Sequence, residues 1–171
     1  MMDFTKIIRT IPDFPKEGIL FRDTTTLFGD AEAFGAAIDT IAEQLEGVDF
    51  DFVTGPEARG FIFGAPLAYK IKKGFIPARK VGKLPPKTVS KSYELEYGSA
   101  TLEISADSIK KGQKVVIVDD LLATGGTCKA LCELIEECGG EVAAIFFFIE
   151  LEALNGRELL EGYNIISQIK Y

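Results

Sequence analysis

The sequence predicts an α/β protein in which a mostly parallel central sheet is flanked by helices, with a small N-terminal hood and a flexible β-hairpin loop. Short apolar stretches alternate along the chain with stretches whose apolar residues recur at helical spacing. This alternation favours right-handed βαβ units, which make the strands parallel. With 171 residues, 47% of them hydrophobic and 26% charged, the chain can bury a core, so residues 1–171 are expected to form a single domain.

The first third of the chain is expected to contain an arm, a helix and a strand. Residues 1–30 are rich in proline and glycine and lack periodicity, so they are interpreted as an N-terminal hood outside the central sheet. Asp30 is a candidate N-cap for the helix that follows, and Gly47 ends that helix. Residues 51–54 then read as a short strand.

The middle of the chain predicts a buried helix, a strand and a hairpin. Residues 61–71 are apolar on nearly every side and contain Pro66, which should kink the helix or lie near its start. Residues 74–78 form the next predicted strand. Proline and glycine make residues 81–91 a mobile loop, and alternation on both sides of Gly98 predicts a β-hairpin, so 81–104 is interpreted as one mobile loop and hairpin.

The last third of the chain contains the stretch with the most chemical information, Val115–Thr127. Its first four residues are β-branched and read as a strand buried on both faces. Asp119 and Asp120 follow, and a Thr-Gly-Gly-Thr turn at 124–127 then leads into an amphipathic helix. Two further strands are predicted at 142–149 and 164–169, with a helical turn near 154–160 between them.

An acid pair and a glycine turn at the end of a buried strand suit a ligand that carries both phosphate and hydroxyl groups. Ligands of open α/β sheets bind at the carboxyl ends of strands, and helix N-termini there favour anions. The alternative is that Gly125 and Gly126 make a tight turn and the acids cap the helix. The chain has neither the Gly-x-x-x-x-Gly-Lys-Ser/Thr nor the Gly-x-Gly-x-x-Gly motif, which lowers support for nucleoside triphosphate hydrolysis and dinucleotide binding.

Three predicted strand ends carry polar residues that parallel strands should bring to one edge of the sheet. They are Glu57-Ala58-Arg59, Arg79-Lys80 and Asp119-Asp120. From Arg59 to Lys91 there are nine basic residues and no acidic one, whereas the rest of the chain has ten basic and 26 acidic residues. We therefore expect a compact polyanion as ligand and no nucleic-acid partner.

The absence of some residue types limits the chemistry further. The chain has no histidine, which excludes Ser-His and Cys-His nucleophilic catalysis and makes a carboxylate the simplest general base. Its three cysteines fall in one predicted helix and are interpreted as reduced apolar residues. No apolar run is long enough to span a membrane and no signal peptide is visible, so we expect a cytoplasmic protein without a membrane partner.

The stretch Val115–Thr127 resembles the ribose-phosphate-binding motif of the type I phosphoribosyltransferases. Four further motifs, in the family's order, are similar to those of the members that act on adenine. They are Phe21-Arg22-Asp23, Glu57-Ala58-Arg59-Gly60-Phe61, Arg79-Lys80-Val81-Gly82-Lys83-Leu84-Pro85 and Tyr93-Glu94-Leu95-Glu96-Tyr97-Gly98.

The resemblance implies transfer of the 5-phosphoribosyl group from 5-phosphoribosyl 1-pyrophosphate to adenine, giving AMP and pyrophosphate. It implies Mg²⁺ held through the substrate rather than by direct protein ligands, and a homodimer. It also assigns residues to groups of the substrates. For the phosphoribosyl group these are Asp119, Asp120, Ala123, Thr124, Gly125, Gly126 and Thr127; for pyrophosphate Glu57, Ala58, Arg59, Arg79, Lys80 and Lys83; for adenine Leu20, Phe21 and Arg22.

The resemblance further implies that Glu96 is the acid–base residue, that Arg59 takes part in catalysis and that Tyr97 packs at the closed site. It also implies a non-proline cis peptide at Glu57-Ala58. From the residues alone, Glu94 competes with Glu96, since both lie on one face of the hairpin. Without the family pattern, Phe21 is nearly as well explained as a core residue of the hood.

Two rival functions remain. One is a phosphoribosyltransferase for another base, such as xanthine or hypoxanthine and guanine. The other is a regulatory protein that senses phosphoribosyl pyrophosphate, which would usually need an additional DNA-binding module for which 171 residues leave no room.

Overall fold

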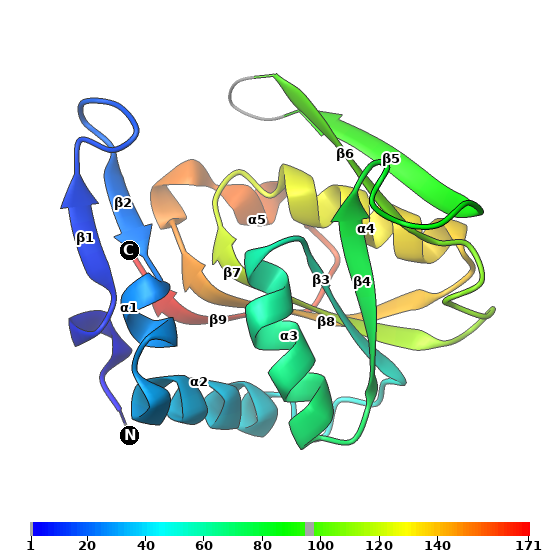
Figure 1. The fold of residues 1–171 in the computed structure, drawn as a ribbon, viewed down its shortest axis with the longest axis horizontal. Coiled ribbons are helices and arrows are strands. Elements are labelled where there is room, and N and C mark those ends of the chain that lie inside the picture. Colours follow the sequence, from blue (N-terminus) through cyan, green and yellow to red (C-terminus); the bar gives the residue numbers. More distant parts are fainter. Residues whose placement is uncertain (1, 95–97) are drawn as a thin grey trace.

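The computed structural model describes residues 2–94 and 98–171 and contains one large and one small β-sheet (Figure 1). The first half of the chain forms η1 (Phe4–Lys6), β1 (Arg9–Pro12), β2 (Leu20–Asp23), α1 (Thr25–Phe28), α2 (Ala31–Gln44), β3 (Phe52–Pro56), α3 (Arg59–Lys70) and β4 (Gly74–Lys80). The second half forms β5 (Thr88–Glu94), β6 (Ser99–Ser105), β7 (Lys114–Leu122), α4 (Gly126–Glu137), β8 (Glu141–Glu150), η2 (Glu152–Leu154), α5 (Gly156–Leu159) and β9 (Ile165–Lys170).

The large sheet has seven strands in the order β5-β6-β4-β3-β7-β8-β9. Strands β4, β3, β7, β8 and β9 run parallel, and the β5–β6 hairpin extends the sheet by antiparallel pairing of β6 with β4. The prediction of a mostly parallel sheet with a hairpin is therefore confirmed. Strands β1 and β2 form a separate two-stranded antiparallel sheet beside it.

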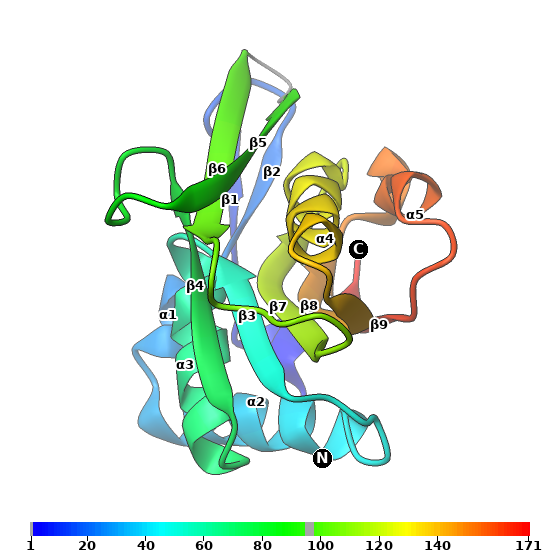
Figure 2. The same cartoon turned by 90° about the vertical axis from the view of Figure 1, so that its right-hand side faces the viewer.

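Helices cover both faces of the central sheet, with α2 and α3 on one side and α4 and α5 on the other (Figure 2). Strand β7 is the shared wall. Val116 and Val118 pack with the α2–α3 core, whereas Val115 and Ile117 pack with the α4 core. All four side chains have no exposed surface, as the continuous apolar run predicts for a strand buried on both faces.

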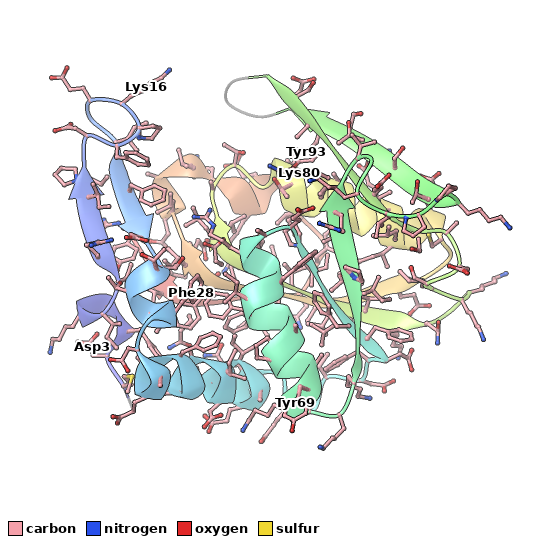
Figure 3. The ribbon with its side chains drawn as sticks, in the orientation of Figure 1. Asp3, Lys16, Phe28, Tyr69, Lys80 and Tyr93 are labelled. Carbon is pink, nitrogen blue, oxygen red and sulfur yellow. The ribbon has the colours of Figure 1, made fainter. Side chains whose placement is uncertain are left out.

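Several predicted boundaries need correction. Strand β5 begins at Thr88, so the loop that the sequence places at 81–91 ends at Lys87. The β-branched pair Thr88-Val89 continues the alternation of the hairpin and overrides the proline signal before it. Helix α3 begins at Arg59 and keeps Pro66 in its interior. It is not buried on all sides, because the Tyr69 side chain on its outer face is 80% exposed (Figure 3).

Two other expectations, on the N-cap of α2 and on the cysteines, agree with the structure. The Asp30 side chain accepts hydrogen bonds from the backbone amides of Glu32 and Ala33, so it caps α2. The three cysteines are free thiols. Among the described residues, no helix is both long and apolar enough to cross a membrane.

Candidate active site

A cleft of about 490 Å³ lies where strands β3 and β7 end and helices α3 and α4 begin. Most of the polar residues that the sequence assigns to a site line it. The lining residues are Pro56, Glu57, Ala58, Arg59, Tyr93, Asp119, Asp120, Leu121, Leu122, Ala123, Thr124, Gly125, Gly126, Thr127, Cys128 and Phe147. Two of the three polar strand ends therefore meet at one edge of the sheet, as the parallel arrangement requires.

One wall of the cleft is the tight connection from β3 to α3. A Cβ atom on Gly55 would lie 2.5 Å from the Val118 carbonyl oxygen, and one on Gly60 would lie 2.6 Å from the Pro56 ring. Only glycine allows the start of α3 to approach β3 and β7 this closely. The intervening peptide Glu57-Ala58 is cis, as the resemblance implies.

Arg59 and Asp120 form an ion pair across the cleft, with 2.9 Å between Arg59 Nε and Asp120 Oδ2. The Asp120 side chain is 4% exposed and that of Arg59 is 43% exposed, so the cation keeps part of its surface open to the cleft. Thr24, a buried residue directly after β2, also donates from its hydroxyl to Asp120 Oδ2 at 3.4 Å. The N-terminal segment thus contacts the acid pair directly.

The two neighbouring carboxyl groups are in different electrostatic surroundings. Burial, and then the negative charge of Asp120, raise the pKa of Asp119 well above its usual value. Burial also raises the pKa of Asp120, but the Arg59 guanidinium opposes that effect. Of the two carboxyl groups, only Asp120 is paired with a cation among the described residues. Asp119 gains most from a ligand that donates hydrogen bonds or brings positive charge.

The floor of the cleft is the turn between β7 and α4. Gly125 has φ +88°, a left-handed conformation in which glycine is favoured, and α4 begins at Gly126. The first amides of a helix have no intrahelical acceptor, and the helix dipole places partial positive charge there. The hydroxyls of Thr124 and Thr127 flank these amides in the cleft lining. Such a turn suits a phosphate dianion.

Helix α5 supports this turn from behind. A Cβ atom on Gly156 would lie 2.2 Å from the Ala123 carbonyl oxygen, and one on Gly125 would lie 2.6 Å from the Gly156 carbonyl oxygen. The next residue, Arg157, makes a two-pronged ion pair with the buried Glu150 at the end of β8, at 2.6 and 2.8 Å. The turn therefore lies against a backbone that is fixed to the central sheet.

The basic residues at the end of β4 lie next to the cleft but not in its lining. Arg79 donates to both carboxylate oxygens of Glu57 at 3.2 Å, and the Lys80 amide donates to the same group. These hydrogen bonds lower the pKa of Glu57, and the one from Arg79 has the largest effect. The Lys80 side chain is labelled at the top of β4 in Figure 3, and Lys83 follows in an exposed loop.

The residues assigned to adenine lie on β2 and do not line the cleft. Leu20 is 54% exposed, and the Phe21 ring packs edge-to-face against Phe14 at 5.1 Å. The Arg22 guanidinium lies over the Tyr171 ring, 3.7 Å from its centroid. Glu96 and Tyr97, assigned to catalysis and loop closure, lie outside the described residues.

The end of β5 approaches the turn between β7 and α4. A Cβ atom on Gly126 would lie 3.0 Å from the Glu94 carbonyl oxygen, and Tyr93 lines the cleft (Figure 3). Sequence reasoning did not select Tyr93 or Thr24 as cleft residues. The alternating pattern that begins at Tyr93 is the signal that could have selected this residue. No local pattern in the sequence indicates Thr24.

Together, the mostly parallel sheet, the acid pair and the glycine turn define a phosphoribosyltransferase of type I, and a family model described as a phosphoribosyl transferase domain matches residues 25–164. Curated relatives are more specific. The adenine phosphoribosyltransferase of Lachnoclostridium phytofermentans is 57% identical over 100% of this chain and 98% of its own length. That of Thermosipho africanus is 60% identical over 98% of this chain and 99% of its own. The chain belongs to the adenine phosphoribosyltransferase family.

Solved structures agree with this assignment. The adenine phosphoribosyltransferase of Thermoanaerobacter pseudethanolicus superposes with a TM-score of 0.95 at 56% identity, covering 98% of both chains. The Saccharomyces cerevisiae enzyme, crystallised with adenine and an imino-altritol bisphosphate, has a TM-score of 0.93 at 38% identity, covering 96% of both chains.

Proposed function

We propose that this protein transfers the 5-phosphoribosyl group of 5-phosphoribosyl 1-pyrophosphate to adenine, forming AMP and pyrophosphate for purine salvage. The observation that carries the proposal is a cleft that contains both the Arg59–Asp120 ion pair and the glycine turn at 124–127. A cation, two carboxyl groups and an anion-binding turn at one edge of the sheet match the pyrophosphate, hydroxyl and phosphate groups of that donor.

The phosphoribosyl group is held by the turn and the acid pair. Backbone amides and hydroxyls of Ala123 to Thr127 bind the 5-phosphate at the start of α4. Asp119 and Asp120 accept hydrogen bonds from the ribose 2- and 3-hydroxyls. Because burial disfavours the charged form of Asp119, binding of a hydroxyl donor stabilises its carboxylate.

Pyrophosphate is held at the opposite wall, by Glu57, Ala58 and Arg59. Arg59 uses Nε for Asp120, and its two terminal nitrogens have no partner among the described residues, so they can donate in parallel to phosphate oxygens. Arg79, Lys80 and Lys83 lie beside this wall and add positive charge that stabilises the leaving group.

Mg²⁺ fits this donor set as an ion held mainly through the substrate. No group of three or more acidic, cysteine or histidine side chains among the described residues could enclose a metal ion, and the cleft offers the carboxylates of Asp119 and Asp120. Mg²⁺ commonly takes one or two carboxylates, directly or through water, together with substrate oxygens. When bound, it neutralises charge on the pyrophosphate as that group leaves.

In the reaction, the bond between ribose C1 and the pyrophosphate oxygen breaks and its electron pair leaves with pyrophosphate. The adenine nitrogen forms the new bond to C1 and loses a proton. We assign acceptance of that proton to Glu96, with Phe21 stacking on adenine, backbone groups of Leu20 and Arg22 reading its polar edge, and Tyr97 packing over the closed site. Residues 1–30 act as a hood, and closure of 81–104 excludes water.

Two measurements test this mechanism. Release of pyrophosphate from the donor should require adenine and should stop when EDTA removes divalent cations; release that continues without adenine would indicate hydrolysis instead. The Glu96→Gln variant should lose far more turnover than Glu94→Gln, the matched control two residues earlier in the sequence. Equal losses would remove Glu96 from the role of proton acceptor.

We further propose a cytoplasmic homodimer. The three free thiols are typical of a reducing compartment. The resemblance supports the dimer, and the exposed Tyr69 on α3 and Val81 after β4 offer apolar surface for a partner. A molecular mass of two chains by light scattering would support this assembly, and the mass of one chain at all concentrations would contradict it.

A further inference from the structure

Glu103 on β6 is a buried carboxyl group whose partners all lie in or just beyond the loop that carries Lys83. Its Oε1 accepts hydrogen bonds from the backbone amides of Lys83 at 3.1 Å and Leu84 at 3.0 Å, and its Oε2 accepts one from the Thr88 hydroxyl at 3.2 Å. Glu103 is only 4% exposed, although it lies in the hairpin at the edge of the sheet. It makes no ion pair to Lys or Arg in the described part of the chain.

A buried carboxyl group without a cationic partner destabilises a fold unless its oxygens are hydrogen-bonded. An apolar residue would fill this buried position equally well, as Leu102 and Ile104 do at the neighbouring positions, where they are 1% and 0% exposed. The feature that only an acidic or amide side chain supplies here is a pair of acceptors for the loop amides. We therefore infer that the role of Glu103 is to hold residues 81–87 in their conformation.

A second contact to the same loop comes from Arg79, near the end of β4. The Lys83 carbonyl oxygen accepts a hydrogen bond from Arg79 Nη1 at 3.2 Å, and Arg79 is in turn paired with Glu57. Lys83 therefore has its amide fixed by Glu103 and its carbonyl fixed by Arg79. This chain of contacts connects the loop backbone to the residue that precedes Ala58 and Arg59.

We propose that Glu103 is a positioning residue for pyrophosphate: it holds the backbone of Lys83 so that the Lys83 ammonium meets the leaving group. The inference rests on the proposed role of Lys83 and adds a residue that does not itself touch substrate. Glu103 is buried and both of its oxygens accept hydrogen bonds from residues 83, 84 and 88, which argues against a direct contact. Orientation of a charged group by a supporting residue affects ligand affinity without changing the ligand contacts themselves.

The test is a double-mutant cycle on pyrophosphate binding, measured by calorimetry with Mg²⁺ present. Glu103→Ala should weaken pyrophosphate about tenfold and leave AMP binding within about twofold. Glu103→Gln should recover most of the loss, because the amide oxygen still accepts both backbone hydrogen bonds. In the Lys83→Ala background, Glu103→Ala should change the affinity by less than about twofold, since the two residues act through one contact.

Two further variants separate positioning from general destabilisation. Leu102→Ala removes a buried side chain of the same strand without touching the loop amides, so it should lower the melting temperature but leave pyrophosphate affinity unchanged. Thr88→Val removes one of the three hydrogen bonds and should give a smaller loss than Glu103→Ala. An equal loss of affinity in Leu102→Ala, or a Glu103→Ala effect that persists undiminished without the Lys83 side chain, would overturn the inference.

The failure of the inference and the failure of the proposed pyrophosphate site are distinguishable. If Lys83→Ala weakens pyrophosphate but Glu103→Ala does not, only the positioning role is overturned. If Lys83→Ala itself leaves pyrophosphate affinity unchanged, the proposed role of Lys83 is wrong, and the role of Glu103 is overturned with it.

Discussion

Arg59 Nε lies 2.9 Å from Asp120 Oδ2, although the two residues belong to different strand–helix junctions. The residue proposed to bind pyrophosphate and one of those proposed to bind ribose are thus a single ion pair. If both assignments hold, the side chains that bind the two groups are in direct contact, so we expect a change in one of them to affect the binding of both groups.

Replacement of Arg59 by lysine should lower kcat/KM by about 100-fold even though the charge is kept, because lysine cannot donate in parallel to two phosphate oxygens while paired with Asp120. Steady-state kinetics with varied phosphoribosyl pyrophosphate measures the effect. The melting temperature should change little, since the Arg59 side chain is 43% exposed. Activity near that of the unaltered protein would show that positive charge alone is sufficient.

Asp119→Asn should make the protein more stable and less active. A carboxyl group whose folded pKa is raised binds protons more tightly when folded, so stability falls as pH rises from the unfolded pKa toward the folded one. Above this range the ionised group destabilises the fold, and its removal should raise the free energy of unfolding at pH 7 by about 1 kcal/mol.

Urea unfolding of both proteins at pH 4 and pH 7 measures this effect, and the gain of Asp119→Asn should be smaller at pH 4. A variant that is less stable than the parent at pH 7 would contradict the assignment of a raised pKa. Affinity for phosphoribosyl pyrophosphate should fall in the same variant, because the ribose hydroxyls lose an acceptor.

Gly156→Ala should weaken binding of the phosphoribosyl group, although Gly156 is not in the cleft lining. The new methyl group would lie 2.2 Å from the Ala123 carbonyl oxygen, so either the turn between β7 and α4 or helix α5 must move. We expect affinity for phosphoribosyl pyrophosphate to fall about tenfold or more, since displacement of a binding group by about 1 Å is costly. Calorimetric titration with the donor measures the loss.

Gly35→Ala is the matched control, since no atom would lie within 4 Å of its new methyl group on α2. It should leave donor affinity unchanged and slightly raise stability, as alanine is favoured over glycine in a helix. Unchanged donor affinity in Gly156→Ala would show that α5 does not determine the position of the turn.

Tyr171→Leu should raise the KM for adenine and leave the KM for the donor unchanged. The Tyr171 backbone is hydrogen-bonded to Glu150 at the end of β8 and to Glu152 at the start of η2, and its ring lies under the Arg22 guanidinium of β2. It therefore connects the strand assigned to adenine with the central sheet. Loss of one cation–π contact costs roughly 0.5–2 kcal/mol, so an increase of about 2- to 30-fold is expected.

Tyr171→Phe keeps the ring and should behave as the unaltered protein in the same kinetic assay. Equal effects of the leucine and phenylalanine variants would assign the change to the hydroxyl group instead. An increase in the KM for both substrates with the leucine variant would indicate a general loss of structure.

The sequence was sufficient for the sheet and for most of the cleft, because both follow from local patterns. Apolar runs marked the strands, and the common direction of parallel strands implied that Arg59 and the acid pair would meet. Glu103 and Thr24 carry no such local signal. Their partners, Lys83 and Asp120, are distant in the chain, and burial of their polar groups becomes visible only when the elements are packed.

The errors have equally specific causes. Composition suggested that α3 is enclosed, but Tyr69 keeps its outer face exposed because α3 packs against the sheet with one face only. Proline at positions 85 and 86 suggested a longer loop, whereas pairing with β6 extends β5 back to Thr88. In both places tertiary packing overrides the local preference.

The most direct measurement of the central claim is product formation from phosphoribosyl pyrophosphate and Mg²⁺ with adenine, hypoxanthine, guanine or xanthine supplied in turn and the nucleotide identified by chromatography. We predict AMP from adenine, with a kcat/KM far above that for the other three bases. No AMP from adenine, or a preference for one of the other bases, would contradict the account.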